Sequence, residues 1–261
     1  MIPEYSLQGK VALITGAGRG IGTGIAEVLA EAGADIALNA LTSQYVVKLA
    51  EGLATRTGRR VLPFVADVTR SDQVEELFCK VLREWGRVDI LVNNLGDAIA
   101  KPLVPLPGQK GSPVSDEEIR KVIDVNLTSA ILCTRAAGPH FLERRSGKIV
   151  IVSSFSGIHG RPNLTLYAAG KSALLGFTRS LALKWAPYGV QVNGISPGTF
   201  PDPVTVGEEG YRQVVENART SVPLGREGRL REVGLLALYL SSPASDYMTG
   251  QMLVLHGGLL T

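Results

Sequence analysis

The feature that most constrains the fold is a regular alternation of short apolar runs with longer stretches of helical periodicity. The apolar runs carry no polar face, which is typical of strands buried on both sides of a parallel sheet. The stretches between them repeat apolar residues every three or four positions, as amphipathic helices do. The predicted strands are residues 10–14, 35–39, 61–65, 88–92, 148–152, 191–195 and 252–255, and the predicted helices are residues 21–32, 43–57, 71–85, 115–144, 165–186 and 229–240.

This alternation predicts an α/β fold, a doubly wound parallel sheet of about seven strands with helices on both faces. The 261 residues contain no linker, repeat or low-complexity segment, so we expect a single domain, residues 1–261. Two proline-containing segments, 97–114 and 199–224, interrupt the pattern, and the second is partly helical. Because both follow a strand, we expect them at the carboxyl edge of the sheet, where such folds bind ligands, with 199–224 as the substrate loop.

A glycine-rich turn follows the first predicted strand. Its spacing is G-x-x-x-G-x-G, and G-x-G-x-x-G does not fit because position 21 is isoleucine. Small residues let a phosphate approach the backbone N–H groups at the start of a helix. A flexible turn is the alternative, but the strand before it and the helix after it favour a dinucleotide site. The residues expected to bind the cofactor here are Thr15, Gly16, Gly18, Arg19, Gly20, Ile21 and Gly22.

Tyr167 and Lys171 lie four residues apart in a predicted helix, so they share one face. A nearby ammonium favours the phenolate, and such a tyrosine exchanges a proton with an alcohol or carbonyl oxygen. A surface pair without a function is the alternative. Ser153 and Ser154 follow the strand at 148–152, and a hydroxyl there can hold a substrate oxygen beside the phenol, which favours an active site.

With these residues the chain resembles the short-chain dehydrogenase/reductase family, over about residues 8–258. The resemblance implies a Rossmann-type fold and an oxidoreductase that transfers a hydride between NAD(P)(H) and a ketone or secondary alcohol, as 3-oxoacyl reductases do. Besides the glycine turn, the matching positions are Asp67-Val68, Asn93-Asn94-Leu95-Gly96, Asn126, Ser154, Tyr167, Lys171 and Pro197-Gly198, with Thr199 after them.

The resemblance also implies a role for each catalytic position. Tyr167 is then the acid/base, Lys171 lowers its pKa and binds the nicotinamide ribose, Ser154 polarises the substrate oxygen, and Asn126 holds a water that relays protons to Lys171. The loop with His159 lines the substrate pocket in this family. Further positions expected around the cofactor are Asp67, Val68, Asn93, Asn94, Gly96, Tyr167, Lys171, Pro197, Gly198 and Thr199; no metal is expected.

The end of the second predicted strand bears on the choice of cofactor. An acid that binds the ribose 2′-hydroxyl selects NAD, and by register with the family that position is Ala40. Positions 36–50 contain no Asp or Glu, and Arg19 stands as in many NADP-preferring members. Leu41 stands where a cation would strengthen this preference. We therefore expect NADP(H), with NAD(H) as the open alternative.

Two departures from the family are Leu95, which replaces alanine, and His256, which replaces aspartate before Gly257-Gly258. We expect the first to be tolerated because both asparagines remain, and the second to be structural.

Charge and composition exclude several classes of partner. A net charge of +3 gives no basic stripe for nucleic acid, and no run of 18 apolar residues predicts a membrane span. Two cysteines without metal-ligand spacing fit a reduced, cytoplasmic setting. The family resemblance implies a homo-oligomer, with a tetramer as the expected state. A non-catalytic dinucleotide-binding or redox-sensing protein on the same fold remains the alternative function.

Overall fold

A computed structural model describes residues 2–259, which form one parallel sheet between two layers of helices. The strand order is β3-β2-β1-β4-β5-β6-β7, so the expected doubly wound topology is confirmed, with its switch point between β1 and β4. The strands are β1 (Val11–Ile14), β2 (Asp35–Ala40), β3 (Val61–Val65), β4 (Ile90–Asn93), β5 (Gly147–Val152), β6 (Val190–Pro197) and β7 (Met252–Leu255).

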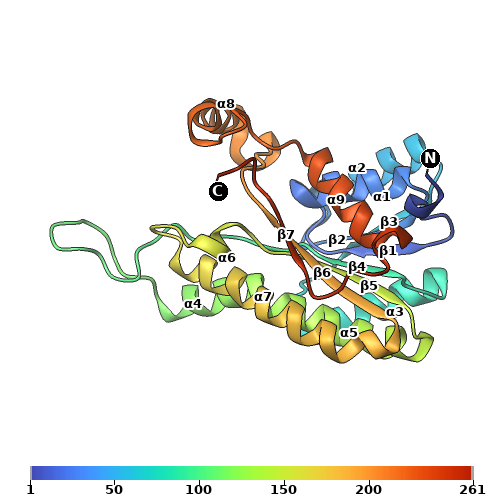
Figure 1. Ribbon diagram of the computed structural model, residues 1–261. Helices are drawn as coiled ribbons and strands as arrows, with labels where there is room; N and C mark the ends of the chain where they lie inside the picture. Colours follow the sequence, from blue (N-terminus) through green and yellow to red (C-terminus); the bar gives the residue numbers. More distant parts are fainter. Residues whose placement is uncertain (1, 260–261) are drawn as a thin grey trace.

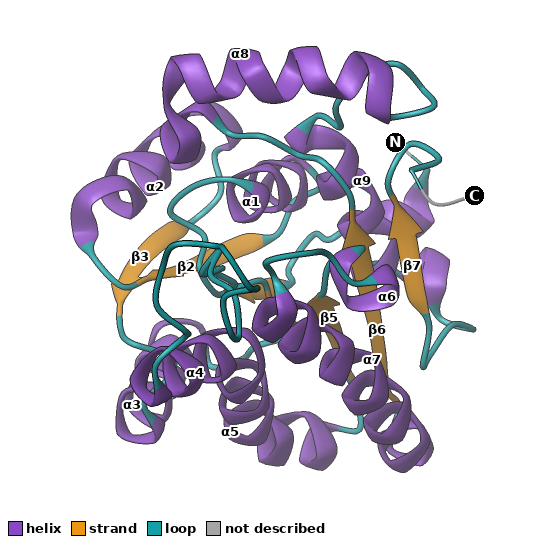
Figure 2. Ribbon diagram, turned by 90° about the vertical axis from the view of Figure 1, so that its left-hand side faces the viewer, coloured by secondary structure: helices purple, strands orange, loops and turns teal. Residues whose placement is uncertain are grey.

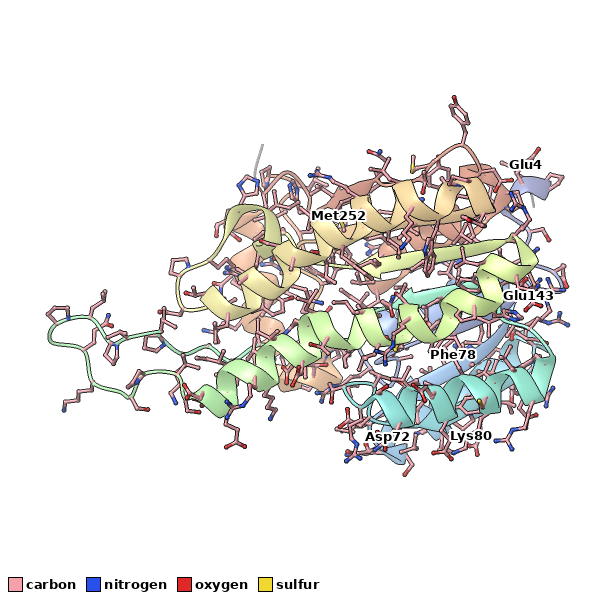
Figure 3. The ribbon with its side chains drawn as sticks, turned by 90° about the horizontal axis from the view of Figure 1, so that it is seen from below. Glu4, Asp72, Phe78, Lys80, Glu143 and Met252 are labelled. Carbon is pink, nitrogen blue, oxygen red and sulfur yellow. The ribbon has the colours of Figure 1, made fainter. Side chains whose placement is uncertain are left out.

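The helices divide between the two faces of the sheet, as Figure 1 shows. One face carries α1, α2 and α9, and the other carries α3, α5 and α7, which lie side by side in Figure 3 with Asp72 and Lys80 on α3 and Glu143 at the end of α5. The helices are α1 (Ile21–Glu31), α2 (Ser43–Thr57), α3 (Ser71–Trp85), α4 (Asp116–Ile123), α5 (Ser129–Arg144), α6 (Ser156–His159), α7 (Thr165–Trp185), α8 (Pro203–Ser221) and α9 (Leu230–Ser241).

Each face of the central strands packs against its own helices. Ile14 of β1 belongs to the apolar cluster that contains Ile25 of α1, whereas its neighbour Leu13 belongs to the cluster that contains Phe141 of α5. All four residues of β1 are buried, as are all four of β4. This two-sided burial explains why the central strands have no polar face in the sequence.

The single helix expected over 115–144 is wrong, because a π-helical turn, Asp124–Thr128, separates α4 from α5. One extra residue in the turn breaks the 3.6-residue register without breaking the run of helical backbone. The segment 97–114 forms neither helix nor strand and extends away from the body of the molecule (Figure 1). Most of 199–224 is the helix α8, which lies across the carboxyl side of the sheet (Figure 2).

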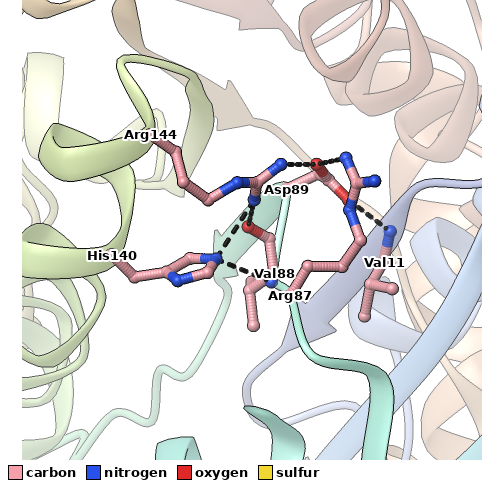
Figure 4. A network of polar contacts seen from close by, with 6 residues as sticks. All are labelled: Val11, Arg87, Val88, Asp89, His140 and Arg144. Atoms are coloured by element: carbon pink, nitrogen blue, oxygen red, sulfur yellow. Dashed lines mark hydrogen bonds and ion pairs between the residues drawn. The ribbon is translucent and has the colours of Figure 1, made fainter.

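A buried carboxylate joins the amino ends of the two central strands. Asp89, only 6% exposed, accepts hydrogen bonds from the Val11 N–H of β1 (2.9 Å), Arg87 Nε (2.8 Å) and Arg144 Nη2 of α5 (3.1 Å). His140 Nε2 accepts the Val88 N–H beside it (Figure 4). Burial raises the pKa of Asp89, but these hydrogen bonds outweigh it and leave the pKa lowered. The network fixes β1 against β4, whose opposite ends carry the candidate site.

Within residues 2–259, the structure contains no helix long and apolar enough to cross a membrane.

Candidate active site

The candidate site lies where the carboxyl ends of β1, β4, β5 and β6 meet. The glycine turn follows β1, Asn93 ends β4, Ser153 and Ser154 follow β5, and Pro197 ends β6. Parallel strands bring these segments, distant in sequence, to one edge of the sheet.

Lys171 is buried beneath this edge with its ammonium hydrogen-bonded to backbone. Its residue is 2% exposed, and Nζ donates to the Val152 carbonyl (3.0 Å) and the Leu95 carbonyl (3.2 Å). Nζ lies 5.9 Å from the centre of the ring of Tyr167, the residue one helical turn earlier on α7. Burial lowers the pKa of Lys171 to about 8. The i, i+4 pair predicted from the sequence therefore exists, and its ammonium lies deeper than the phenol.

The phenol of Tyr167 is in contact with Ser154. Desolvation raises the pKa of Tyr167, the hydrogen bond with the Ser154 side chain lowers it, and the charge of Asp97 raises it, so that the net shift is upward. The net direction is set by burial of the phenol, and the expected lowering of this pKa by Lys171 stays a prediction. Ser154 Oγ also accepts the Ser156 N–H at 3.1 Å, so the Ser154 hydroxyl is held by α6.

Asn126 lies in the π-helical turn and ties the segment after β4 to the helix. Its amide nitrogen donates to the Val122 carbonyl (2.9 Å) and the Asp97 carbonyl (2.6 Å), and its oxygen accepts the Asp97 N–H (3.3 Å). These bonds hold Gly96 against Lys171. A Cβ at Gly96 would lie 2.7 Å from Lys171 Nζ, so a side chain here would displace the ammonium.

The glycine turn is framed by Asn94. Its side-chain nitrogen donates to the carbonyls of Thr15 and Gly16, both at 3.0 Å, and its own N–H donates to Thr15 Oγ1 at 3.1 Å. Gly16 and Gly20 have positive φ (61° and 63°), which explains glycine at both positions. A Cβ at Gly22 would lie 2.8 Å from the Ala17 Cα, so the turn closes tightly around the start of α1.

The remaining expected positions have mainly structural contacts. Asn93 donates to Thr134 Oγ1 of α5 at 2.9 Å, away from the glycine turn. Asp67 caps its own turn by accepting from Thr69, and Val68 is buried in the core. Thr199 accepts the Gly228 N–H through its carbonyl. At the two positions that depart from the family pattern, Leu95 packs against Gly16 and His256 lies against Gly198.

A cavity of about 260 Å³ adjoins the glycine turn between α2 and α8. Arg19 lies at its rim together with Lys48 of α2, a residue that the sequence analysis missed although Gln44 and Lys48 share a helical face. Asp202 at the start of α8 was also missed; its carboxylate accepts the Gly20 N–H at 2.9 Å. The residues lining the cavity are Gly18, Arg19, Gly20, Thr23, Gln44, Tyr45, Lys48, Leu49, Asp202, Val204 and Leu230.

These features suit a dinucleotide. The turn after β1 is built from glycines at positions where a Cβ would collide with neighbouring atoms, so no side chain covers its backbone. The N–H groups at the start of α1 suit phosphate oxygens. The ammonium of Lys171 and the hydroxyls of Ser154 and Tyr167 gather at the ends of β4 and β5. Among residues 2–259, no three His, Cys, Asp or Glu side chains gather in a way that could hold a metal ion.

Comparisons with known proteins agree with this geometry. The family model described as enoyl-(acyl carrier protein) reductase matches residues 16–260. The chain is 37% identical over 257 residues to the 3-oxoacyl-[acyl-carrier-protein] reductase FabG of Thermotoga maritima, covering 97% of this chain and 99% of that protein. It is 35% identical over 257 residues to the 2-dehydro-3-deoxy-D-gluconate 5-dehydrogenase of Bacillus subtilis, covering 98% and 97%.

Solved structures are similar over the same extent. A short-chain type dehydrogenase/reductase from Mycobacterium marinum has a TM-score of 0.88 at 33% identity and covers 98% of this chain and 97% of its own. The NADPH-dependent 3-quinuclidinone reductase from Rhodotorula rubra has a TM-score of 0.86 at 32% identity, covering 98% and 93%.

Proposed function

We propose, from the premise that this chain belongs to the short-chain dehydrogenase/reductase family, that Tyr167 is its acid/base and that Lys171, Ser154 and Asn126 serve that tyrosine. Members of the family are oxidoreductases that transfer a hydride between a nicotinamide cofactor and a ketone or secondary alcohol, and this chain is one of them. The alternative of a non-catalytic sensor is therefore not retained. The observation that carries the proposal is the buried ammonium of Lys171, which lies one helical turn from Tyr167 and 5.9 Å from the centre of its ring.

Each residue has a distinct task in the proposed mechanism. The Ser154 hydroxyl holds the substrate oxygen, and the Tyr167 phenol donates a proton to that oxygen during reduction or removes it during oxidation. The Lys171 ammonium favours the phenolate that results. Asn126 keeps the chain from Gly96 to Asp97 in place over Lys171. The bound nicotinamide supplies the hydride.

A substitution of the phenol tests this assignment. Tyr167→Phe is expected to lower kcat by about 10²- to 10⁴-fold, because the proton donor is lost while the ring remains. Binding of NADPH, followed by its fluorescence, is expected to stay within about twofold, well below the tenfold change that 1.4 kcal/mol would produce. Tyr188→Phe, at an exposed tyrosine, is the matched control. A Tyr167→Phe enzyme that keeps full turnover would refute the role.

We further propose that NADP(H) is preferred over NAD(H). Arg19 and Lys48 at the rim of one cavity supply two positive charges, and neither Ala40 nor Leu41 at the end of β2 repels a 2′-phosphate. Arg19→Ala is expected to lower kcat/KM for NADPH by about tenfold, equivalent to 1.4 kcal/mol, and to leave that for NADH nearly unchanged. Steady-state kinetics with both cofactors on the wild type provide the check; a clear preference for NADH contradicts the proposal.

The substrate is proposed to be a small carbonyl compound or its alcohol, contacted by 199–224 as the substrate loop. The lone helix α8 in this segment lies over the carboxyl side of the sheet, and relatives with different named substrates share the fold. A panel of 3-oxoacyl, sugar-derived and cyclic ketones, followed by loss of NADPH absorbance, distinguishes the classes.

Assembly, location and domain organisation remain proposals. A homotetramer is supported by the family and by exposed apolar side chains such as Leu183 of α7. A cytoplasmic location is supported by the exposed free thiol of Cys79, which is typical of a reducing compartment. A single domain over 1–261 is supported by the continuous sheet.

A further inference from the structure

The glycine turn carries a hydrogen bond from a distant carboxylate. Gly20, the residue before α1, donates its N–H to Asp202 Oδ2 at 2.9 Å, and Asp202 is 8% exposed. The first turn of α1 has no acidic residue and no side-chain cap of its own. Because the start of a helix favours negative charge, Asp202 occupies a position that suits an anion.

The same carboxylate begins α8. Oδ1 accepts the Val204 N–H at 3.2 Å, and Oδ2 accepts the Thr205 hydroxyl at 2.8 Å. The first helical turn ends at Gly207, whose φ of 74° and ψ of 165° are not helical, so this turn is separated from the rest of α8. Val204 and Val206 are 52% and 43% exposed. The turn is therefore joined to the glycine turn through Asp202 and is separated from the rest of α8 at Gly207.

We propose that Asp202 is a latch that holds the first turn of α8 on the glycine turn and competes with the cofactor diphosphate for the Gly20 N–H. The inference rests on the proposed function, which places the diphosphate at this turn. Two anions at one N–H repel each other, and like charges brought together at an interface are costly. The diphosphate therefore displaces Asp202 and releases the turn from Asp202 to Val206.

The latch couples the cofactor to the proposed substrate loop. When the carboxylate holds Gly20, α8 is anchored and cofactor binding is weakened; when the diphosphate is bound, the first turn of α8 is released. Such coupling is reciprocal, so a substrate that prefers the released position of α8 also strengthens cofactor binding. The cavity of about 260 Å³ between Arg19 and Val204 gives the turn space in which to move.

Two variants separate the charge of Asp202 from its role as a helix cap. Asp202→Ser keeps an N-cap acceptor for α8 but is too short to hold Gly20 as well, and Asp202→Asn keeps the shape and removes the charge. Glu208→Gln, at an exposed carboxylate on the same helix, is the control. Circular dichroism confirms that each variant is folded.

Binding of NADPH, ADP-ribose and adenosine is measured by fluorescence and calorimetry. Asp202→Ser is expected to bind NADPH and ADP-ribose about tenfold more tightly than the wild type, a change that corresponds to 1.4 kcal/mol. Asp202→Asn is expected to give a smaller gain. Adenosine, which has no phosphate, and the Glu208→Gln protein with any ligand are expected to show no gain.

Amide hydrogen exchange in the peptide over residues 201–207 gives a second readout. In the wild type without ligand the amide of Val206, which donates to the Asp202 carbonyl, is expected to be protected, and NADPH or Asp202→Ser, by releasing this turn from the glycine turn, is expected to reduce that protection. Unchanged or weaker NADPH binding by both Asp202 variants overturns the latch and leaves the proposed function intact. Failure of the wild type and every variant to bind NADPH or NADH overturns the proposed function itself.

Discussion

Lys171 is a positive charge held inside the protein, and its position has an energetic cost. Its ammonium donates to the carbonyls of Val152 and Leu95, and among residues 2–259 it has no carboxylate partner. Burial lowers its pKa from 10.5 to about 8, so protonation is less favourable in the folded than in the unfolded chain. The site therefore keeps a charge that the fold alone would not favour.

This cost makes stability depend on pH in a defined direction. Between the folded pKa of about 8 and the unfolded value of 10.5, the unfolded chain binds more protons, so stability rises with pH. From pH 8 to 9.5 the wild type is expected to gain about 1.5 kcal/mol from this residue. Lys171→Met is expected to lose that gain, together with activity.

Urea unfolding at the two pH values measures the difference between the two proteins. Lys48→Met, which removes an exposed ammonium, is the control and is expected to retain the gain. An identical pH dependence in wild type and Lys171→Met would show that the ammonium is not under strain.

At the residue scale the sequence predicts the parts of the site that are local. Tyr167 and Lys171 are recognisable because four residues place them on one helical face, and Ser154 because it directly follows a strand. Asp202 is not recognisable, because its contact with Gly20 joins positions far apart in the chain. The raised pKa of Tyr167 also depends on the burial of the phenol, which no spacing of residues reveals.

At the scale of elements, strands were predicted more accurately than the helix that carries Asn126. The central strands are buried on both faces, so each is visible as an apolar run. The helix at 115–144 is different, since the π-helical turn at Asp124–Thr128 adds one residue without changing the composition or the apolar spacing enough to be noticed. The extended segment 97–114 has no pattern from which its course could be predicted.

The contact between β1, β4 and α5 through Asp89 predicts a stability effect without an effect on binding. Asp89→Ala is expected to lower the free energy of unfolding by about 2 to 3 kcal/mol, because Arg87 and Arg144 lose their common partner. NADPH affinity is expected to be unchanged, since the network lies at the opposite end of the strands.

The stabilising contribution of Asp89 is expected to depend on pH. Because its pKa lies below the ordinary value of 3.8, its contribution is present above 3.8 and is lost as the pH falls through the folded value. Urea unfolding at pH 7 and at a pH below 3.8 provides the measurement. Glu216→Ala, which breaks an exposed pair with Arg219, is the control and is expected to cost less than about 1 kcal/mol. Equal costs for the two variants would contradict the role of Asp89.

At the scale of the whole molecule, α7 presents apolar side chains to the outside. Leu183 is 81% exposed and Ile131 of the neighbouring α5 is 38% exposed. Burial of a leucine stabilises by about 1.5 to 3 kcal/mol, so an interface between copies of the chain would gain from covering Leu183. Leu183→Glu is expected to reduce the mass in solution, measured by light scattering, toward that of one 27.7 kDa chain. Thr55→Glu on α2 is expected to leave the mass unchanged; a wild type that is already monomeric contradicts the proposed tetramer.

The position of the switch point between β1 and β4 has a consequence for how this protein can diverge. The strands before it and after it extend to opposite sides of the sheet. Arg19, Lys48 and Asp67 therefore come from the first third of the chain, whereas Ser154, Tyr167 and α8 come from the remainder. A chimera of two family members joined within α3 would therefore combine the nucleotide preference of one with the substrate preference of the other. The hydrogen bond from Gly20 to Asp202 is the exception, because it crosses that junction.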